Sequence, residues 1–517
     1  MRFAFLLLLV LASCTRADSQ WGMPGEARIV QLGDIWNLNP LTAFGQRLID
    51  LTQIYAQPLV GVSPDNRAIP ILCEEVPRVE NGGISRDART ITYHLRRGVR
   101  FADGVEFTSH DVVFTYRAAI DSRNAISEMA PYLRVASVDA PDKYTVVFHL
   151  KAPWSGAPRE LFAASDYIFG ILPAHAFHDN TDMRRAAWNN RPFGTGPFYV
   201  TQWRRGDRVV MERNPYSWQH PKLQRLIVRI VPDENAALVA IRAHEVDFTD
   251  ITADQVEQMR PLRDVSLIAV PRNESDQLEL QTQGDAMRDR RMREAVAYAI
   301  DRATLARTVY RGLSPLATTE VPPLFPEHDG SIVARTYDPS RARALVRAAG
   351  YTGEVRVAFN NAESMYRSAA TVVQQNLRDA GMNAVLRGAA PSVLYGPAGQ
   401  GGIYYGGRFD VAVSGWYGGL DPETSEPWIC ANRAPNGPNL ARWCDAPYDG
   451  AFNDQQRTLD PVRRTQDFHT MQQRMSNNVT AVFMVYRTEY EAINPSLRGV
   501  APNMLYNFGQ TQDWSLQ

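Results

Sequence analysis

The stretch FADGVEFTSHDVVFTY, residues 101–116, decides how the surrounding chain folds. Asp103-Gly104 is a turn signal. Thr108, with Asp111 three residues later, is typical of a helix N-cap followed by an acidic first turn. The apolar residues that follow recur at helical spacing and are Val112, Val113, Tyr116, Ala119 and Ile120. The stretch therefore predicts a turn that leads directly into an amphipathic helix.

Two segments with alternating apolar and polar residues flank this helix. They are ARTITYHL, residues 88–95, and KYTVVFHL, residues 143–150. Strict alternation over this length predicts half-buried strands. Together with the helix they form a compact strand–turn–helix–strand unit, which is a candidate domain of its own.

The rest of the chain alternates between predicted strands and helices. Residues 191–214 indicate a Gly/Pro turn followed by a hairpin, and residues 225–231 indicate a buried strand that leads into a helix near 233–244. The apolar stripe of residues 288–312 predicts one amphipathic helix that ends at Gly312.

Further helices are expected near residues 338–349 and 363–380. Asp338 is placed as N-cap and Pro339 as first helical residue, while Gly350 and Gly381 follow the two helices. Strands are expected at about 383–387 and 409–414. Alternation of helices and strands favours an α/β fold class.

Bulk composition is that of a folded chain with more than one domain. With 517 residues it is too long for a single ordinary core, so two or three domains are expected. The chain is 44% hydrophobic and 21% charged, and its net charge of −1 gives no field that would attract nucleic acid. We therefore expect no nucleic-acid partner.

The N-terminus has the features of an export signal. Arg2 precedes an apolar run over residues 3–11, which is too short to span a membrane. The tetrad Leu11-Ala12-Ser13-Cys14 resembles the lipobox of bacterial lipoproteins, in which the cysteine is lipid-modified. Residues 1–14 are thus predicted to be a lipoprotein signal peptide, and acylated Cys14 would anchor the chain to a membrane surface. The alternative is a plain signal peptide with an incidental cysteine.

Three further cysteines are present. Cys430 and Cys444 bracket a loop rich in Pro, Asn and Gly, which in an exported protein favours a disulfide over two unpaired thiols. Cys73 would then be a buried free thiol. None of the three has a His or Cys neighbour at zinc-binding spacing, so no metal site is expected.

Motifs of the common enzyme classes are missing from the sequence. It contains no G-x-S-x-G, H-E-x-x-H, G-x-x-x-x-G-K-[ST] or C-x-x-C. The Gly-rich run at 396–402 has no Lys-Ser/Thr and is interpreted as a loop. We expect a protein that is not an enzyme and that has no cofactor.

Five segments, in order, resemble those that characterise family 5 of the bacterial extracellular solute-binding proteins, the peptide/nickel class or cluster C. They are residues 101–116, FGTGPFYVTQWRRGDRVVMERNPYSW (193–218), RDRRMREAVAYAIDRATL (288–305), YDPSRARALVRAAGY (337–351) and FDVAVSGWYGGLDPE (409–423). The resemblance covers about residues 27–510. Any one of these segments alone would be weak, whereas five in the family's order are specific.

The resemblance implies a type II periplasmic-binding-protein fold. Two α/β lobes would be joined by a hinge, with an extra α+β domain attached to one of them. Lobe I would comprise residues 27–56, 193–270 and 482–517, the extra domain residues 57–192, and lobe II residues 271–481, with chain crossings near 271 and 481. The implied function is the substrate-binding component of an ABC transporter, a monomer in the periplasm or cell envelope. Its partners would be a small-molecule or peptide ligand and the permease and ATPase subunits.

The candidate ligand-binding loop follows the 409–414 strand. Trp416 and Tyr417 offer flat apolar surfaces with polar tips, and Gly418 and Gly419 allow close approach of a ligand to the backbone. In family members that bind peptides, this loop carries an Asp that pairs with the ligand's α-ammonium group. Gly419 stands at that position here, and the next acid is Asp421.

A second candidate segment precedes the helix near 363. Dipeptide binders of the family carry an Arg there for the ligand carboxylate, whereas this chain has Asn360 and Asn361 and no Arg before Glu363. Phe44 of lobe I completes the set of candidate ligand contacts. Both groups that clamp a zwitterionic dipeptide are therefore expected to be absent.

Several ligand classes stay open. A longer peptide could bind as an added strand, with Asp421 or Glu363 in place of the missing acid. A neutral oligosaccharide or glycoside could stack on the two aromatic rings and bond to the two asparagines. A metal chelate is the least favoured, since the nine His form no cluster. A lipid-anchored chaperone or sensor on the same fold is the alternative outside transport.

Overall fold

The computed structural model describes residues 21–42, 46–124, 126, 129–163, 170–422 and 426–516. The predicted signal peptide with Cys14 and the candidate contact Phe44 lie outside the described residues. The largest unit is a ten-stranded mixed sheet in the order β13-β12-β14-β11-β15-β10-β1-β9-β8-β7. Its strands are β1 (Glu26–Leu32), β7 (Phe198–Arg204), β8 (Arg208–Arg213), β9 (Arg225–Val231), β10 (Phe248–Ile251), β11 (Ser266–Leu280), β12 (Glu354–Asn360), β13 (Asn383–Ala389), β14 (Val411–Tyr417) and β15 (Ala481–Ile493).

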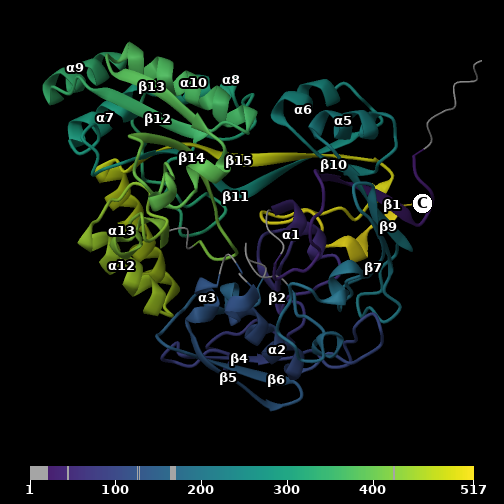
Figure 1. Ribbon diagram of the computed structural model, residues 1–517. Helices are drawn as coiled ribbons and strands as arrows, with labels where there is room; N and C mark the ends of the chain where they lie inside the picture. Colours follow the sequence, from purple (N-terminus) through teal and green to yellow (C-terminus); the bar gives the residue numbers. More distant parts are fainter. Residues whose placement is uncertain are drawn as a thin grey trace, which may run out of the picture.

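Two long antiparallel strands, β11 and β15, connect the two halves of this sheet (Figure 1). On one side β15 pairs with β10, and on the other side β11 pairs with β14. Their register shifts between Pro271, opposite Thr488, and Ser275, opposite Tyr486. Residues 272–274 therefore face Arg487 alone, and this bulge lies at the junction of the halves.

The first half of the sheet consists of β10, β1, β9, β8 and β7, and we call it the first lobe. It is covered by α5 (Glu234–Arg242) and α6 (Ala253–Met259), and α1 (Gln46–Thr52) follows its first strand. Asp233 caps α5, because its carboxylate accepts the amides of Asn235 and Ala236 at 2.9 Å. The predicted hairpin, buried strand and following helix are confirmed as β7–β8, β9 and α5.

The second lobe consists of β12, β13 and β14 with their helices. β12 pairs in parallel with both neighbours, and α10 (Ser364–Asp379) packs on all three strands. The predicted helix at 338–349 is confirmed as α9 (Pro339–Ala349), with the Asp338 side chain as cap and Gly350 in the left-handed region at φ +71°.

The prediction of one helix over 288–312 is wrong. The structure has two helices, α7 (Arg290–Ala299) and α8 (Arg302–Thr308). Ile300 has extended backbone dihedrals, and the Asp301 carboxylate accepts the amide of Thr304 at 2.9 Å. Asp301 thus caps a new helix and interrupts the predicted one, because a capping aspartate competes with helix continuation.

The extra domain lies below the first lobe in Figure 1. Its three-stranded sheet has the order β4-β6-β5, and α2 packs against it. The capping box predicted for Thr108 and Asp111 is confirmed, with the Thr108 amide 2.9 Å from an Asp111 carboxylate oxygen. The elements of this domain are β2 (Val60–Val62), β3 (Ala68–Pro70), β4 (Thr90–His94), α2 (Ser109–Ile120), α3 (Ala130–Leu133), β5 (Val135–Asp142), β6 (Thr145–Leu150) and α4 (Ala157–Glu160).

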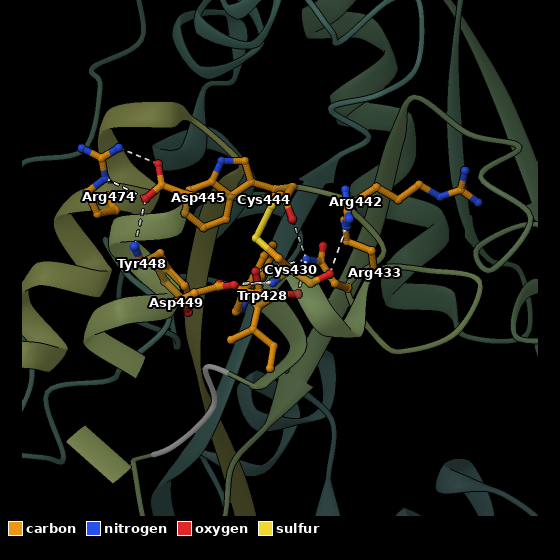
Figure 2. The surroundings of a disulfide bond; sticks show 12 residues. Trp428, Cys430, Arg433, Arg442, Cys444, Asp445, Tyr448, Asp449 and Arg474 are labelled. Carbon is orange, nitrogen blue, oxygen red and sulfur yellow. Dashed lines mark hydrogen bonds and ion pairs between the residues drawn. A yellow bond between two sulfur atoms is a disulfide. The ribbon is translucent and has the colours of Figure 1, made fainter. Parts of the chain in front are cut away.

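A helical hairpin, α12 (Ala446–Arg457) and α13 (Pro461–Asn478), extends from the second lobe toward the extra domain (Figure 1). The predicted Cys430–Cys444 disulfide is present directly before it, with a Cα–Cα distance of 4.5 Å (Figure 2). Asp449 of α12 accepts the Cys430 amide at 3.2 Å. Cys73 is buried and has no disulfide partner among the described residues.

Candidate functional site

The candidate site lies where β14 ends beside the bulge of β11. Glu274 is directly opposite Tyr417, and Asp276 is directly opposite Gly415. Alternate residues of a strand point to the same face, so these four positions share one face of the sheet. The junction between the lobes therefore carries two acids next to the loop that the sequence indicates.

Arg487 of β15 forms a buried ionic cluster with both acids. Its Nε lies 2.9 Å from Asp276 Oδ2 and 3.1 Å from Glu274 Oε1. Asp276 also accepts hydrogen bonds from the hydroxyls of Tyr310 at 2.8 Å and Tyr366 at 3.2 Å. Asp276 is thus fully satisfied, and the guanidinium is held mainly by this one carboxylate.

Gly415 is required for this cluster. A Cβ at this position would lie 2.7 Å from both Asp276 Oδ1 and the Tyr366 hydroxyl, and 3.5 Å from Glu274 Oε1. The missing side chain of Gly415 makes room for the two acids to lie over the neighbouring strand.

Glu274 is the less satisfied acid. Its side chain is 3% exposed, and Oε1 accepts no hydrogen bond from any described residue. Burial raises the pKa of Glu274 to about 8, since the nearby Arg487 offsets the desolvation only in part. The nearby Glu274 carboxylate is the main cause that raises the pKa of the Tyr417 phenol well above its usual range.

Arg272, the first residue of the bulge, connects both long strands to the end of the chain. It lies 2.7 Å from a Glu489 oxygen and 3.2 Å from a Glu491 oxygen. It also donates to the Asn503 carbonyl at 2.7 Å and to the Asn507 side chain at 2.6 Å. This network fixes the first-lobe side of the junction.

Trp416 points to the opposite face of β14 from Tyr417. Its indole N–H donates to Glu279 Oε1 at 2.9 Å, and the Ser414 hydroxyl donates to the same oxygen at 2.8 Å. Burial raises the pKa of Glu279 to about 7 in spite of these two hydrogen bonds. Trp416 is half-buried, whereas Tyr417 is 53% exposed. Of the two predicted aromatic contacts, Tyr417 is therefore the more accessible.

The glycines of the loop are bound to β11 through Asn273. The Gly418 amide donates to the Asn273 carbonyl, and the Asn273 side chain donates to the Gly419 carbonyl, both at 2.8 Å. Gly419 stands at the position where peptide binders carry an acid. These hydrogen bonds hold it beside Asn273, the residue that precedes Glu274.

The predicted segment before α10 lies close to the same cluster. The Asn360 amide donates to Glu363 Oε1 at 2.7 Å, and the Asn361 amide is paired with the Ala389 carbonyl at 3.0 Å. Partial desolvation of its carboxyl group raises the pKa of Glu363, and Arg487 partly counteracts this rise. Asn360 is buried, whereas Asn361 and Glu363 are exposed, so the latter two can meet a ligand.

Asp421 occupies a different environment. Its side chain is fully buried, Arg464 of α13 lies 2.6 Å from Oδ1, and Arg159 of the extra domain lies 3.2 Å from Oδ2. Both carboxylate oxygens are therefore engaged by arginines. This arrangement favours a structural role for Asp421 over the predicted contact with a ligand.

Further contacts join the second lobe to the extra domain beside Asp421. The Ser155 amide donates to the Gln456 carbonyl at 2.7 Å, and its hydroxyl donates to the Gln455 carbonyl at 2.8 Å. Arg134 donates to the Gln456 side chain at 2.8 Å and stacks over the Trp154 ring at 4.1 Å. The helical hairpin α12–α13 is thus in direct contact with the extra domain.

The sequence prediction missed the cluster of Glu274, Asp276 and Arg487. A signal was present, because the segment NESDQLELQ (273–281) carries three acids and is buried throughout. Charged residues inside a fully buried strand need partners and are often functional. Within the described ranges, no group of three or more His, Cys, Asp or Glu residues is arranged to hold a metal ion.

Comparison with known proteins identifies the family to which this chain belongs. The model of the bacterial extracellular solute-binding proteins, family 5, matches residues 69–436, which is more than two thirds of the chain. The chain belongs to this family. It is therefore a solute-binding protein with a substrate-binding role, and the family is one of transport proteins rather than enzymes. Among the described residues, no helix is long and apolar enough to cross a membrane.

Proteins similar to this chain are named for, or were solved with, different ligands. A dipeptide-binding protein of Escherichia coli K12 is 24% identical over 461 residues, which cover 81% of this chain and 82% of the relative. The substrate-binding protein CtaP of Listeria monocytogenes has a TM-score of 0.84 at 21% identity, with 95% and 99% of the two chains covered. NikA of Brucella suis, solved with Fe(III)-EDTA, has a TM-score of 0.82 at 21% identity, with 95% and 100% covered. These similarities show the type II periplasmic-binding-protein fold, with two α/β lobes and an extra domain.

Proposed function

We propose that this solute-binding protein closes its two lobes on a peptide or related small solute and delivers it to the permease of an ABC importer. Family membership supports the transport role. The junction between the two halves of the main sheet supports the closing motion. Within the described part of the chain, only β11 and β15 continue from one half of the sheet to the other. A two-strand connection with a bulge is a suitable hinge.

The proposed domains follow from this hinge. Residues 27–56, 193–270 and 482–517 would move as lobe I, with the extra domain, residues 57–192, attached to it. Residues 271–481 would move as lobe II. Closure would bring α12–α13 against Ser155 and Arg159 of the extra domain, where the hydrogen bonds and the ion pair described above would hold the closed state.

The proposed ligand contacts lie along the edge formed by Tyr417, Gly418, Gly419, Asn361 and Glu363. An extended peptide could add to this edge through backbone hydrogen bonds. Trp416 would support the loop from the opposite face through its hydrogen bond to Glu279. The exposed ring of Tyr417 also suits stacking against a sugar, so an oligosaccharide or glycoside is the second candidate.

We further propose that Cys14 is acylated and anchors the protein, as a monomer, to a membrane of the cell envelope. Mass spectrometry of the protein from its own host tests this directly. A diacylated Cys14 as the mature N-terminus is expected. An unmodified N-terminus at any other residue would contradict the anchor without affecting the binding role.

The binding role is tested with the soluble body, residues 15–517. We expect a peptide digest or an oligosaccharide mixture to raise its melting temperature, because a ligand bound only by the folded state stabilises it. Tyr417→Ala should abolish that shift, whereas Tyr216→Ala, at a ring 48% exposed outside the site, should preserve it. A shift that survives Tyr417→Ala would refute the proposed site, and the absence of any shift would refute the proposed ligand classes.

A further inference from the structure

The acidic side chains at the lobe junction carry more charge than the basic side chains that face them. Glu274 and Asp276 share the single guanidinium of Arg487. Asp276 holds it through two nitrogens, at 2.9 and 3.3 Å, and also accepts from two tyrosine hydroxyls. Glu274 retains only the 3.1 Å contact with Arg487 Nε, without hydrogen-bond geometry. One buried carboxylate is therefore left without a full counter-charge.

The surroundings add further negative charge rather than neutralise it. The charged and titratable groups near Glu274 are Arg272 and Asp276 on β11, Arg487 and Glu489 on β15, Tyr417 on β14, Glu363 and Tyr366 on α10, and Tyr310 after α8. Two arginines thus face four carboxylates. A ligand that supplies one positive charge would reduce this excess.

Glu274 lies at the edge where the proposed ligand would bring this positive charge. It lies directly opposite the exposed Tyr417, and its neighbour Asn273 is hydrogen-bonded to both Gly418 and Gly419. Gly419 is the loop position at which peptide-binding relatives are expected to carry an acid. The loop of this chain lacks that acid, while the adjacent strand provides one at the same edge.

We infer that Glu274 receives a positively charged amino group of the ligand, so that the acid for the ligand's cation comes from the crossing strand β11 instead of the loop after β14. The inference rests on the proposed function and narrows the substrate class to solutes that carry an ammonium group, with peptides that have a free amino group as the first example. Asp276 and Arg487 position Glu274 and do not contact the ligand's cation.

A matched pair of peptide mixtures tests this inference. The soluble body is incubated with a tryptic digest of casein and, separately, with the same digest after exhaustive acetylation of its amines, and native mass spectrometry identifies what is retained. Retention from the untreated digest alone is expected. Equal retention from both mixtures would overturn the role of Glu274 and leave the proposed peptide-binding function intact. Retention from neither would overturn peptide binding itself, and the inference with it.

Substitution then assigns the effect to Glu274. For a synthetic copy of the retained peptide, Glu274→Gln should weaken binding about ten- to hundred-fold, the usual loss of a buried charge-assisted contact. Glu354→Gln, which removes a partly exposed acid paired with Arg387, is the control and should change affinity less than about two-fold. An unchanged affinity of Glu274→Gln would contradict the assignment.

Proton release separates a direct contact from a structural effect. Burial raises the pKa of Glu274, whereas pairing with a cation favours its ionised form, so ligand binding should release a proton from it. Calorimetric titration at pH 7 in two buffers of different ionisation enthalpy should therefore show proton release on ligand binding. Glu274→Gln should release none. Equal proton release from wild type and variant would overturn the inference.

Discussion

Arg159 of the extra domain and Asp421 of the second lobe form an ion pair, with Arg159 Nη1 3.2 Å from Asp421 Oδ2. The Asp421 side chain is fully buried, whereas that of Arg159 is 43% exposed. Arg464, which is 9% exposed, holds the other carboxylate oxygen at 2.6 Å. The two residues are therefore held differently: Asp421 is buried and bound by Arg464 within the second lobe, whereas Arg159 reaches it from the extra domain and is partly exposed.

This inequality predicts different costs for the two residues. Asp421→Ala leaves the buried Arg464 without its closest carboxylate and should lower the free energy of unfolding by about 3 kcal/mol. Arg159→Ala should lower it by less than about 1 kcal/mol, because the Arg159 side chain is partly exposed and Asp421 keeps its contact with Arg464. Urea unfolding of the unliganded protein measures both values. Equal costs would contradict the view that Asp421 belongs to the second lobe.

Gly415→Ala should disrupt the ionic cluster. The new Cβ would lie 2.7 Å from Asp276 Oδ1 and from the Tyr366 hydroxyl, so the acids would have to move. We expect a loss of about 2 kcal/mol in unfolding free energy and a loss of ligand binding. Gly450→Ala in α12 is the control, since no atom apart from its chain neighbours and the backbone of its own helix lies within 4 Å of the added Cβ. It should stabilise the protein by about 0.5–1 kcal/mol. If Gly450→Ala destabilises the protein, the space around an added Cβ does not predict the effect of these substitutions.

The Cys430–Cys444 disulfide closes a short loop in front of α12 (Figure 2). Its reduction should lower the free energy of unfolding by about 3 kcal/mol, because the unfolded chain gains conformational freedom. Calorimetry with and without reductant measures the change. The double variant Cys430→Ser/Cys444→Ser should not respond to reductant, since Cys73 is unpaired among the described residues. A response of that variant would show that another bond is involved.

Glu279 should make stability depend on pH. Its pKa is raised to about 7 in the folded protein, against 4.5 for the ordinary side chain, so the folded state binds more protons between these values. Stability contributed by this group is full below pH 4.5 and declines as pH rises to about 7, by on the order of 3 kcal/mol. Glu279→Gln should flatten this part of a melting-temperature profile. An identical slope in the variant would exclude Glu279 as the cause.

Features encoded in a few adjacent residues could be predicted from the sequence. The capping box of Thr108 and Asp111, the Asp338-Pro339 start of α9 and the disulfide all depend on local spacing, and the structure confirms them. Of the helix predicted over 288–312, the buried apolar stripe was predicted correctly as far as Ile300, but its last member, Ala303, is exposed. The break after Ala299 was not predicted, since Asp301 caps a new helix there.

The ionic cluster could not be predicted in the same way. Asp276 and Arg487 are 211 residues apart in sequence, and their contact depends on the register and the bulge of β11 against β15. The loop of Trp416 to Gly419 was identified from the family pattern. Which of its two aromatic rings is exposed depends on which face of β14 each ring points to. Long-range register decides these points, and a single sequence does not contain it in readable form.

Hydrogen–deuterium exchange with and without ligand tests the central claim most directly. Binding between the lobes should slow exchange at residues 415–419 and 272–276, and closure should also slow it at residues 154–160 and 455–464, where the extra domain meets the helical hairpin. We expect slower exchange at all four of these segments when ligand is bound. Protection confined to other surfaces, or none at these segments with ligand bound, would contradict capture of a solute by closure of the two lobes.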